Sequence, residues 1–125
     1  MSGKELYITY EELLKLENFR KPNSPPKKPQ NIDITHLDDI EVIIANGKGI
    51  QALDREAINE LPLTGWVCRF PAHIHPPKGL KFIQISEHIF NIAPARNMPL
   101  QKFEALVKEL TISAITIFKK QGRAV

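Results

Sequence analysis

The chain has 125 residues, of which 42% are hydrophobic and 25% charged, so it is long enough for one globular domain, residues 1–125, whose core needs no disulfide. A single cysteine excludes an internal disulfide, no apolar run is long enough for a membrane span, and the first residues lack the pattern of a secretory signal. These features predict a cytoplasmic protein, and a net charge of only +3, spread along the chain, argues against a dedicated nucleic-acid-binding surface.

The first third of the chain predicts a short helix and a long loop. Leu6-Tyr7-Ile8 is an apolar stretch, and Thr9 and Glu12 then have the spacing of a capping box. A helix of about two turns should follow this cap. Residues 20–30, RKPNSPPKKPQ, contain four prolines, which exclude a helix and remove backbone donors from a sheet. We expect this segment to be a proline-rich surface loop.

The middle of the chain alternates between strands and turns. Ile40 to Ile44 is β-branched and suited to a buried strand, and the four residues 46–49, NGKG, then force a turn. Gln51 to Leu61 has helical spacing, although part of it also fits a strand. Residues 65–70 alternate as in a strand, and one face of that strand would carry Trp66, Cys68 and Phe70.

An antiparallel hairpin is predicted next. Leu80 to Ile85 and His88 to Ala93 have the composition of strands, and Ser86-Glu87 is the only turn between them. In the second strand, a period of two places His88 on the face of Phe90 and Ile92, with Glu87 on the opposite face.

A helix that begins near Met98, with Pro99 as its first residue, follows this hairpin. Its apolar stripe consists of Leu100, Phe103, Leu106, Val107 and Leu110. Residues 111–120 fit either a second helix or an edge strand. Together the elements predict an α+β fold with small antiparallel sheets and flanking helices.

Two groups of polar residues have both a structural and a functional interpretation. Between hairpin and helix, residues 94–99 contain two prolines, an arginine and an asparagine, which fit either a constrained corner or part of a site. Cys68, His73 and His75 offer a thiolate and two imidazoles, which suit zinc or copper, but a fourth ligand is not evident, so we expect no metal. The acidic residues 38, 39 and 41 are interpreted as a solvated helix start or strand flank.

Three stretches from Asn46 onward resemble a known family in their motifs and their order. They are NGKGIQALDR, GWVCRFPAHIHPPKGLKF and EHIFNIAPARNMPLQKFEALVKEL. In the family, a glycine-rich turn leads to a hydrophobic-Asp-Arg step, here residues 53–55. A Pro-Pro-x-Leu-lysine loop follows, here residues 76–81, and then a His-containing strand that ends in Pro-Ala-Lys/Arg-x-Met, here residues 88–98. Over its C-terminal two-thirds the chain thus resembles the ADP-ribosyltransferase-like toxins typified by the type VI secretion cytotoxin Tse-two.

The resemblance implies two small sheets packed face to face, with NAD bound as a substrate in the cleft between them. It implies His88 as the catalytic residue, and Gln51, Arg55 and Tyr7 as residues that bind NAD. Its chemistry requires positive charge to be stabilised as nicotinamide leaves and an acceptor to be activated. A toxin of this kind serves bacterial competition: it is delivered into the cytosol of a target cell, modifies a protein or nucleic acid there, and is neutralised by a cognate immunity protein.

The sequence also departs from the family pattern. Many members have an arginine where Ile8 stands, and a Thr-Ser pair where this chain has Ile50-Gln51. Hydroxyl groups that would bond nicotinamide or ribose are therefore missing at these positions. Two hypotheses follow: an NAD-dependent ADP-ribosyltransferase, and a non-catalytic module that binds a protein partner.

Overall fold

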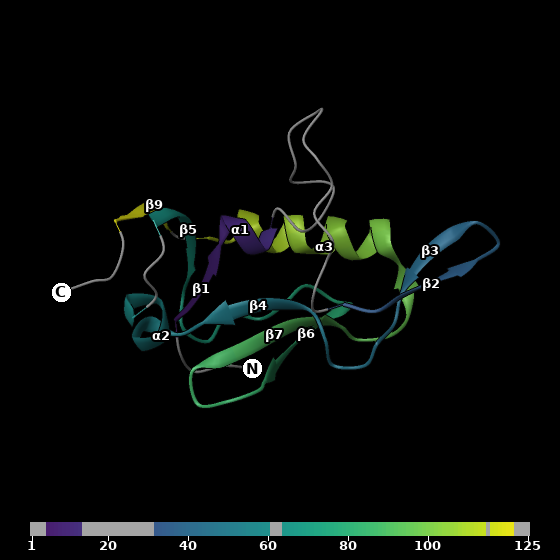
Figure 1. Cartoon of the computed structure of the whole chain (residues 1–125), viewed down its shortest axis with the longest axis horizontal. Helices are drawn as coiled ribbons and strands as arrows, with labels where there is room; N and C mark the ends of the chain where they lie inside the picture. Colours follow the sequence, from purple (N-terminus) through teal and green to yellow (C-terminus); the bar gives the residue numbers. More distant parts are fainter. Residues whose placement is uncertain (1–4, 14–31, 61–63, 115, 122–125) are drawn as a thin grey trace.

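The computed structural model describes residues 5–13, 32–60, 64–114 and 116–121. They form a mixed α+β structure with two antiparallel sheets and flanking helices, so the predicted fold class is confirmed at this level (Figure 1). The predicted proline-rich loop, residues 20–30, lies outside the described residues. No helix within the described ranges is long and apolar enough to cross a membrane.

The larger sheet has six strands in the order β6-β7-β4-β1-β5-β9, and each neighbouring pair is antiparallel. Its last strand, β9, lies at one edge, so the ambiguous segment 111–120 forms an edge strand after a helix end. The six strands are β1 (Leu6–Thr9), β4 (Ile50–Leu53), β5 (Thr64–Phe70), β6 (Leu80–Gln84), β7 (Ile89–Pro94) and β9 (Thr116–Gln121).

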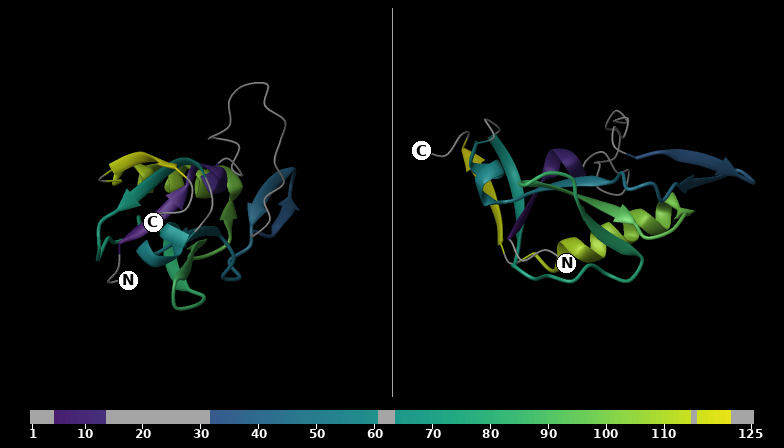
Figure 2. Two further views of the ribbon diagram at one scale, coloured as in Figure 1. Left: turned by 60° about the vertical axis from the view of Figure 1, so that its left-hand side comes forward. Right: turned by 90° about the horizontal axis from the view of Figure 1, so that it is seen from below.

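The smaller sheet contains β2 (Ile34–Leu37), β3 (Ile40–Ile43) and β8 (Met98–Pro99), in that order. The β2–β3 hairpin projects away from the body of the molecule, beyond the end of the long helix (Figures 1 and 2). The resemblance implied two sheets stacked face to face, but the two sheets of this structure are not stacked in that way. The prediction of a buried strand at residues 40–44 is also wrong for its first half. Ile40 and Glu41 are exposed and only Ile43 is fully buried, because the hairpin leaves the core.

Three helices complete the described structure: α1 (Tyr10–Leu13), α2 (Arg55–Glu60) and α3 (Leu100–Ile112). The predicted cap of α1 is confirmed, because the Glu12 N–H donates to Thr9 Oγ1 at 3.3 Å. The segment 51–61, which fitted both strand and helix, divides into β4 and α2. The predicted C-terminal helix is also confirmed, although Met98 and Pro99 first pair with β3 and the helix starts at Leu100.

The main core lies between α3 and one face of the six-stranded sheet. On α3, Phe103, Val107 and Leu110 are fully buried, so the predicted apolar stripe faces the core. The other face of the sheet has a smaller core, made of Tyr7, Leu53, Ile58 and Val67. In β5, Cys68 and Phe70 join the main core as predicted, whereas Trp66 near the strand start is 50% exposed.

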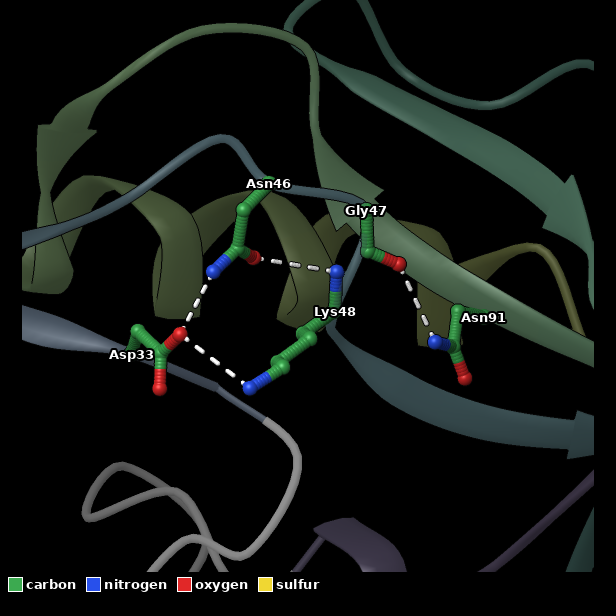
Figure 3. A network of polar contacts seen from close by, with 5 residues as sticks. All are labelled: Asp33, Asn46, Gly47, Lys48 and Asn91. Carbon is green, nitrogen blue, oxygen red and sulfur yellow. Dashed lines mark hydrogen bonds and ion pairs between the residues drawn. The ribbon is translucent and has the colours of Figure 1, made fainter.

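The NGKG turn before β4 is fastened on both sides by polar contacts (Figure 3). The Asn46 side chain and Lys48 Nζ both donate to Asp33 Oδ2, at 2.5 Å and 3.2 Å. On the other side, Asn91 Nδ2 donates to the Gly47 carbonyl at 3.0 Å. Lys48 is thus paired with a carboxylate beside the turn.

The corner at residues 94–99 is fixed by contacts with distant segments. The Ala95 N–H donates to the Gly79 carbonyl at 2.8 Å, and the Ala45 N–H donates to Asn97 Oδ1 at 2.7 Å. The Arg96 side chain is exposed. The interpretation of this segment as a constrained corner is therefore supported, with Asn97 as the residue that ties it down.

Candidate functional site

The loop between β6 and β7 presents His88 at the surface. The N–H groups of Ile85 and Ser86 both donate to the Ile89 carbonyl, at 2.9 and 3.2 Å, and close the predicted hairpin. His88 belongs to this loop rather than to the strand, which starts at Ile89. The predicted common face of His88, Phe90 and Ile92 is therefore wrong. Phe90 and Ile92 are buried in the core, whereas the His88 side chain is 35% exposed.

Asp54, at the junction of β4 and α2, holds the imidazole ring. Its Oδ2 lies 2.6 Å from His88 Nδ1, and its Oδ1 accepts a hydrogen bond from the Ala57 N–H at 2.9 Å. The Asp54 N–H also donates to the His88 carbonyl at 3.1 Å. Asp54 therefore caps α2 and orients His88 at the same time. Because an ionised carboxylate only accepts, Nδ1 carries a proton and the neutral ring has its lone pair on Nε2.

Two more carboxylates lie on the Nε2 side of the ring. Glu56 Oε2 is 3.5 Å and Glu87 Oε2 is 3.8 Å from His88 Nε2, and both side chains are largely exposed. In an ideal strand Glu87 would face away from His88, but neither residue lies in a regular strand, and the hairpin loop brings the two side chains together. The hydrogen bond to Asp54, and the charges of all three carboxylates, raise the pKa of His88 above its ordinary value, although loss of hydration opposes this.

Arg55, the first residue of α2, takes part in a second polar group. Its Nη2 lies 2.8 Å from Glu5 Oε1, and Arg69 Nη1 lies 3.6 Å from Glu5 Oε2. A hydrogen bond with the Tyr7 hydroxyl, and the charge of Glu5, raise the pKa of Arg55 further above its ordinary value. Tyr7 lies on β1 beside this group. Its ring is buried in the smaller hydrophobic core and is not exposed for contact with a ligand.

Gln51 is the most separate of the predicted site residues. It lies on β4 opposite Asn91, on the strand face that also carries Leu53 and hence Tyr7. Its backbone N–H donates to Glu12 Oε2 at 3.4 Å. Ile8, where family members have an arginine, is fully buried in the main core. The structure thus brings Arg55 to Tyr7, holds His88 beside the start of α2, and leaves Gln51 further along the sheet.

Asp54 and Glu56 are the functional candidates that the sequence did not single out. Asp54 was noted only as the middle of the Leu53-Asp54-Arg55 step. An aspartate immediately before a helical segment is a signal for a helix cap. In this sequence the signal is weak because residues 51–61 fit both a strand and a helix, so the pattern does not show where the helix begins.

The candidate metal ligands do not converge. Cys68 is buried in the core, whereas His73 and His75 are exposed in the loop after β5. His73 has a φ of 62°, in the left-handed region, which is uncommon for a residue other than glycine. Among the residues with described positions, no three His, Cys, Asp or Glu side chains form a group that would hold a metal ion.

The His88 site is suited to proton transfer at Nε2, since an imidazole oriented by a buried carboxylate is a common acid–base arrangement. The carboxylates of Glu56 and Glu87 also make its surroundings favourable for positive charge. No family model, no curated protein and no solved structure matches the chain.

Proposed function

We propose that the chain is a small effector toxin that acts on NAD by ADP-ribosyl transfer, with His88 as the catalytic residue. The resemblance of residues 88–98 to the toxin family supports the reaction class. The observation that carries the proposal is the 2.6 Å contact between His88 Nδ1 and Asp54 Oδ2, because it fixes the tautomer and the aim of the ring. A ring fixed in this way is ready to accept a proton from an acceptor hydroxyl or amine through Nε2.

The charges around His88 fit the nicotinamide end of such a substrate. NAD supplies a glycosidic bond whose cleavage leaves positive charge on the ribose. Glu56 and Glu87 would lower the free energy of that charge, while His88 takes the proton of the attacking group. Arg55 fits the diphosphate, because its side chain is 65% exposed and a guanidinium has five N–H groups, more than its bonds to Glu5 and Tyr7 use.

The decisive experiment compares two histidine variants. Wild-type chain, His88→Gln and His75→Gln are assayed for NAD binding by calorimetry, for nicotinamide release, and for growth inhibition when expressed in bacteria. His75 is the matched control because it is also an exposed loop histidine outside the site. We expect His88→Gln to lose about 100-fold or more in rate, as for loss of a general base, with its fold retained as judged by circular dichroism. His75→Gln should behave as wild type.

A wild-type chain that neither binds NAD nor harms cells would contradict the enzyme proposal. The alternative function, a non-catalytic module that binds a protein partner, is favoured by one observation. Ile8, at the place of a family arginine, is completely buried among apolar side chains, so no polar group reaches a substrate from there. On that alternative, His88→Gln would be silent in every assay of activity.

A further inference from the structure

The projecting β2–β3 hairpin leaves one strand edge open beside α3. On this edge, β8 pairs with β3 only at Val42↔Pro99 and Ile43↔Met98. Continuing the antiparallel register would place residues 100 and 101 opposite residues 41 and 40, but the chain enters α3 at Leu100 and leaves the sheet. Among the strands that the structure describes, none pairs with Ile40 and Glu41 on this side.

A groove of about 440 Å³ lies at this open edge, where β8 would have continued. One wall is formed by the start of β3 and the other by the first turns of α3. The lining residues are Asp39, Ile40, Glu41, Pro99, Leu100, Gln101 and Glu104. A space bounded by an open strand edge and a helix has the form that accepts an added strand.

The lining of the groove indicates what such a strand would carry. Asp39 and Glu41 are acidic and exposed, Glu104 is acidic but buried, and no lining residue is basic, on a chain whose net charge is positive. Ile40, whose side chain is 52% exposed, and Leu100 add apolar surface. The turn next to the groove is a two-residue hairpin turn, in which Asp38 and Asp39 both adopt positive φ, 50° and 66°.

From these features we infer that the groove binds an extended, basic segment of a partner protein. This segment adds to β3 as a strand beyond the end of β8, opposite Ile40 and Glu41. Backbone hydrogen bonds to the β3 edge give the segment its register, and its lysine or arginine side chains meet the exposed carboxylates of Asp39 and Glu41. An apolar side chain on the segment covers Ile40 and Leu100. This site is distant in the fold from His88 and does not depend on the proposed reaction with NAD.

The test uses the whole chain and a defined peptide of alternating lysine and valine. Isotope-labelled protein is titrated with this peptide, and backbone amide resonances are followed by NMR. We expect the shifts to concentrate at Ile40, Glu41, Leu100 and Gln101. A peptide with glutamate in place of lysine, and one with methylated backbone nitrogens, should each bind about tenfold more weakly or worse, because they lose the charge complement and the strand hydrogen bonds respectively.

Two charge reversals separate specific binding from general attraction. Glu41→Lys lies in the groove, whereas Glu109→Lys changes the charge equally at an exposed position of α3 outside it. Glu41→Lys should weaken binding about tenfold and Glu109→Lys by less than about twofold. Equal losses in both variants, shifts centred elsewhere on the protein, or equal affinity for the glutamate peptide would overturn the inference. So would concentration-dependent self-association through this edge, which would make a second copy the occupant.

Discussion

Asp54 and His88 are separated by 34 positions in the chain, yet their side chains meet at 2.6 Å and their backbones are joined by a 3.1 Å hydrogen bond. The pairing follows from sheet register: β4 ends at Leu53, opposite Ile89 at the start of β7. The residues just beyond this pair, one after β4 and one before β7, are therefore held together. A buried carboxylate and a surface imidazole become one unit, and the first prediction concerns how that unit titrates.

His88 should titrate above its ordinary pKa of 6.5, because its contact with Asp54 favours the charged ring. Since the pKa is raised on folding, this contact stabilises the protein fully below the ordinary value, and the contribution is lost as pH rises through the raised value. NMR titration of the imidazole checks the direction, and Asp54→Asn should bring the pKa back down. The fall in melting temperature between about pH 6 and about pH 8 should be smaller in His88→Gln than in wild type. An unshifted His88 would contradict the contact.

The two roles of Asp54 can be separated by substitution. Both Asp54→Ser and Asp54→Ala remove the carboxylate that faces His88, but serine keeps an oxygen that accepts from the Ala57 N–H. We expect Asp54→Ala to be less stable than Asp54→Ser by about 1 kcal/mol in denaturant unfolding, the usual value of a helix cap. Both variants should show the same His88 titration. If the two are equally stable, the cap of α2 contributes nothing measurable.

Gly49 and Gly65 should respond in opposite ways to alanine. A Cβ on Gly49 would lie 1.9 Å from the Ile92 carbonyl oxygen, so β4 and β7 would have to separate. We expect Gly49→Ala to cost about 1–3 kcal/mol or more of unfolding free energy. A Cβ on Gly65 meets nothing within 4 Å, and alanine there should be neutral or stabilise by about 0.5–1 kcal/mol. Similar midpoints for the two variants in denaturant would show that the close approach at Gly49 is not real.

Cys68 should be unreactive in the folded chain, and purified protein should contain no stoichiometric zinc. Burial raises the pKa of the Cys68 thiol, which reduces the thiolate available for alkylation near neutral pH. His73 and His75 lie in an exposed loop and do not converge with it. Alkylation by iodoacetamide should therefore follow global unfolding, as measured across a denaturant series. One zinc per chain, lost on His73→Ala or His75→Ala, would contradict this prediction.

Local pattern was a good guide wherever an element is stabilised by its own neighbours. The Thr9 cap of α1, the apolar stripe of α3 and the hairpin turn at residues 86–87 depend on residues a few positions apart. The same patterns failed where burial depends on distant partners. The β-branched run at residues 40–44 was expected inside, but the hairpin that its strand forms with β2 projects from the body, so its first residues are exposed.

By itself, the sequence determined that the chain is an α+β protein with a strand–loop–strand–corner–helix order from Leu80 to Leu110, since turn residues and hydrophobic period fix these locally. It also singled out His88. Only the tertiary structure decided what surrounds that residue, because β4 and β7 are paired across about 40 positions and register alone brings Asp54 and Glu56 to the ring. The groove beside β3 has the same origin: it exists because the chain enters α3 at Leu100, one residue after its pairing with β3 ends.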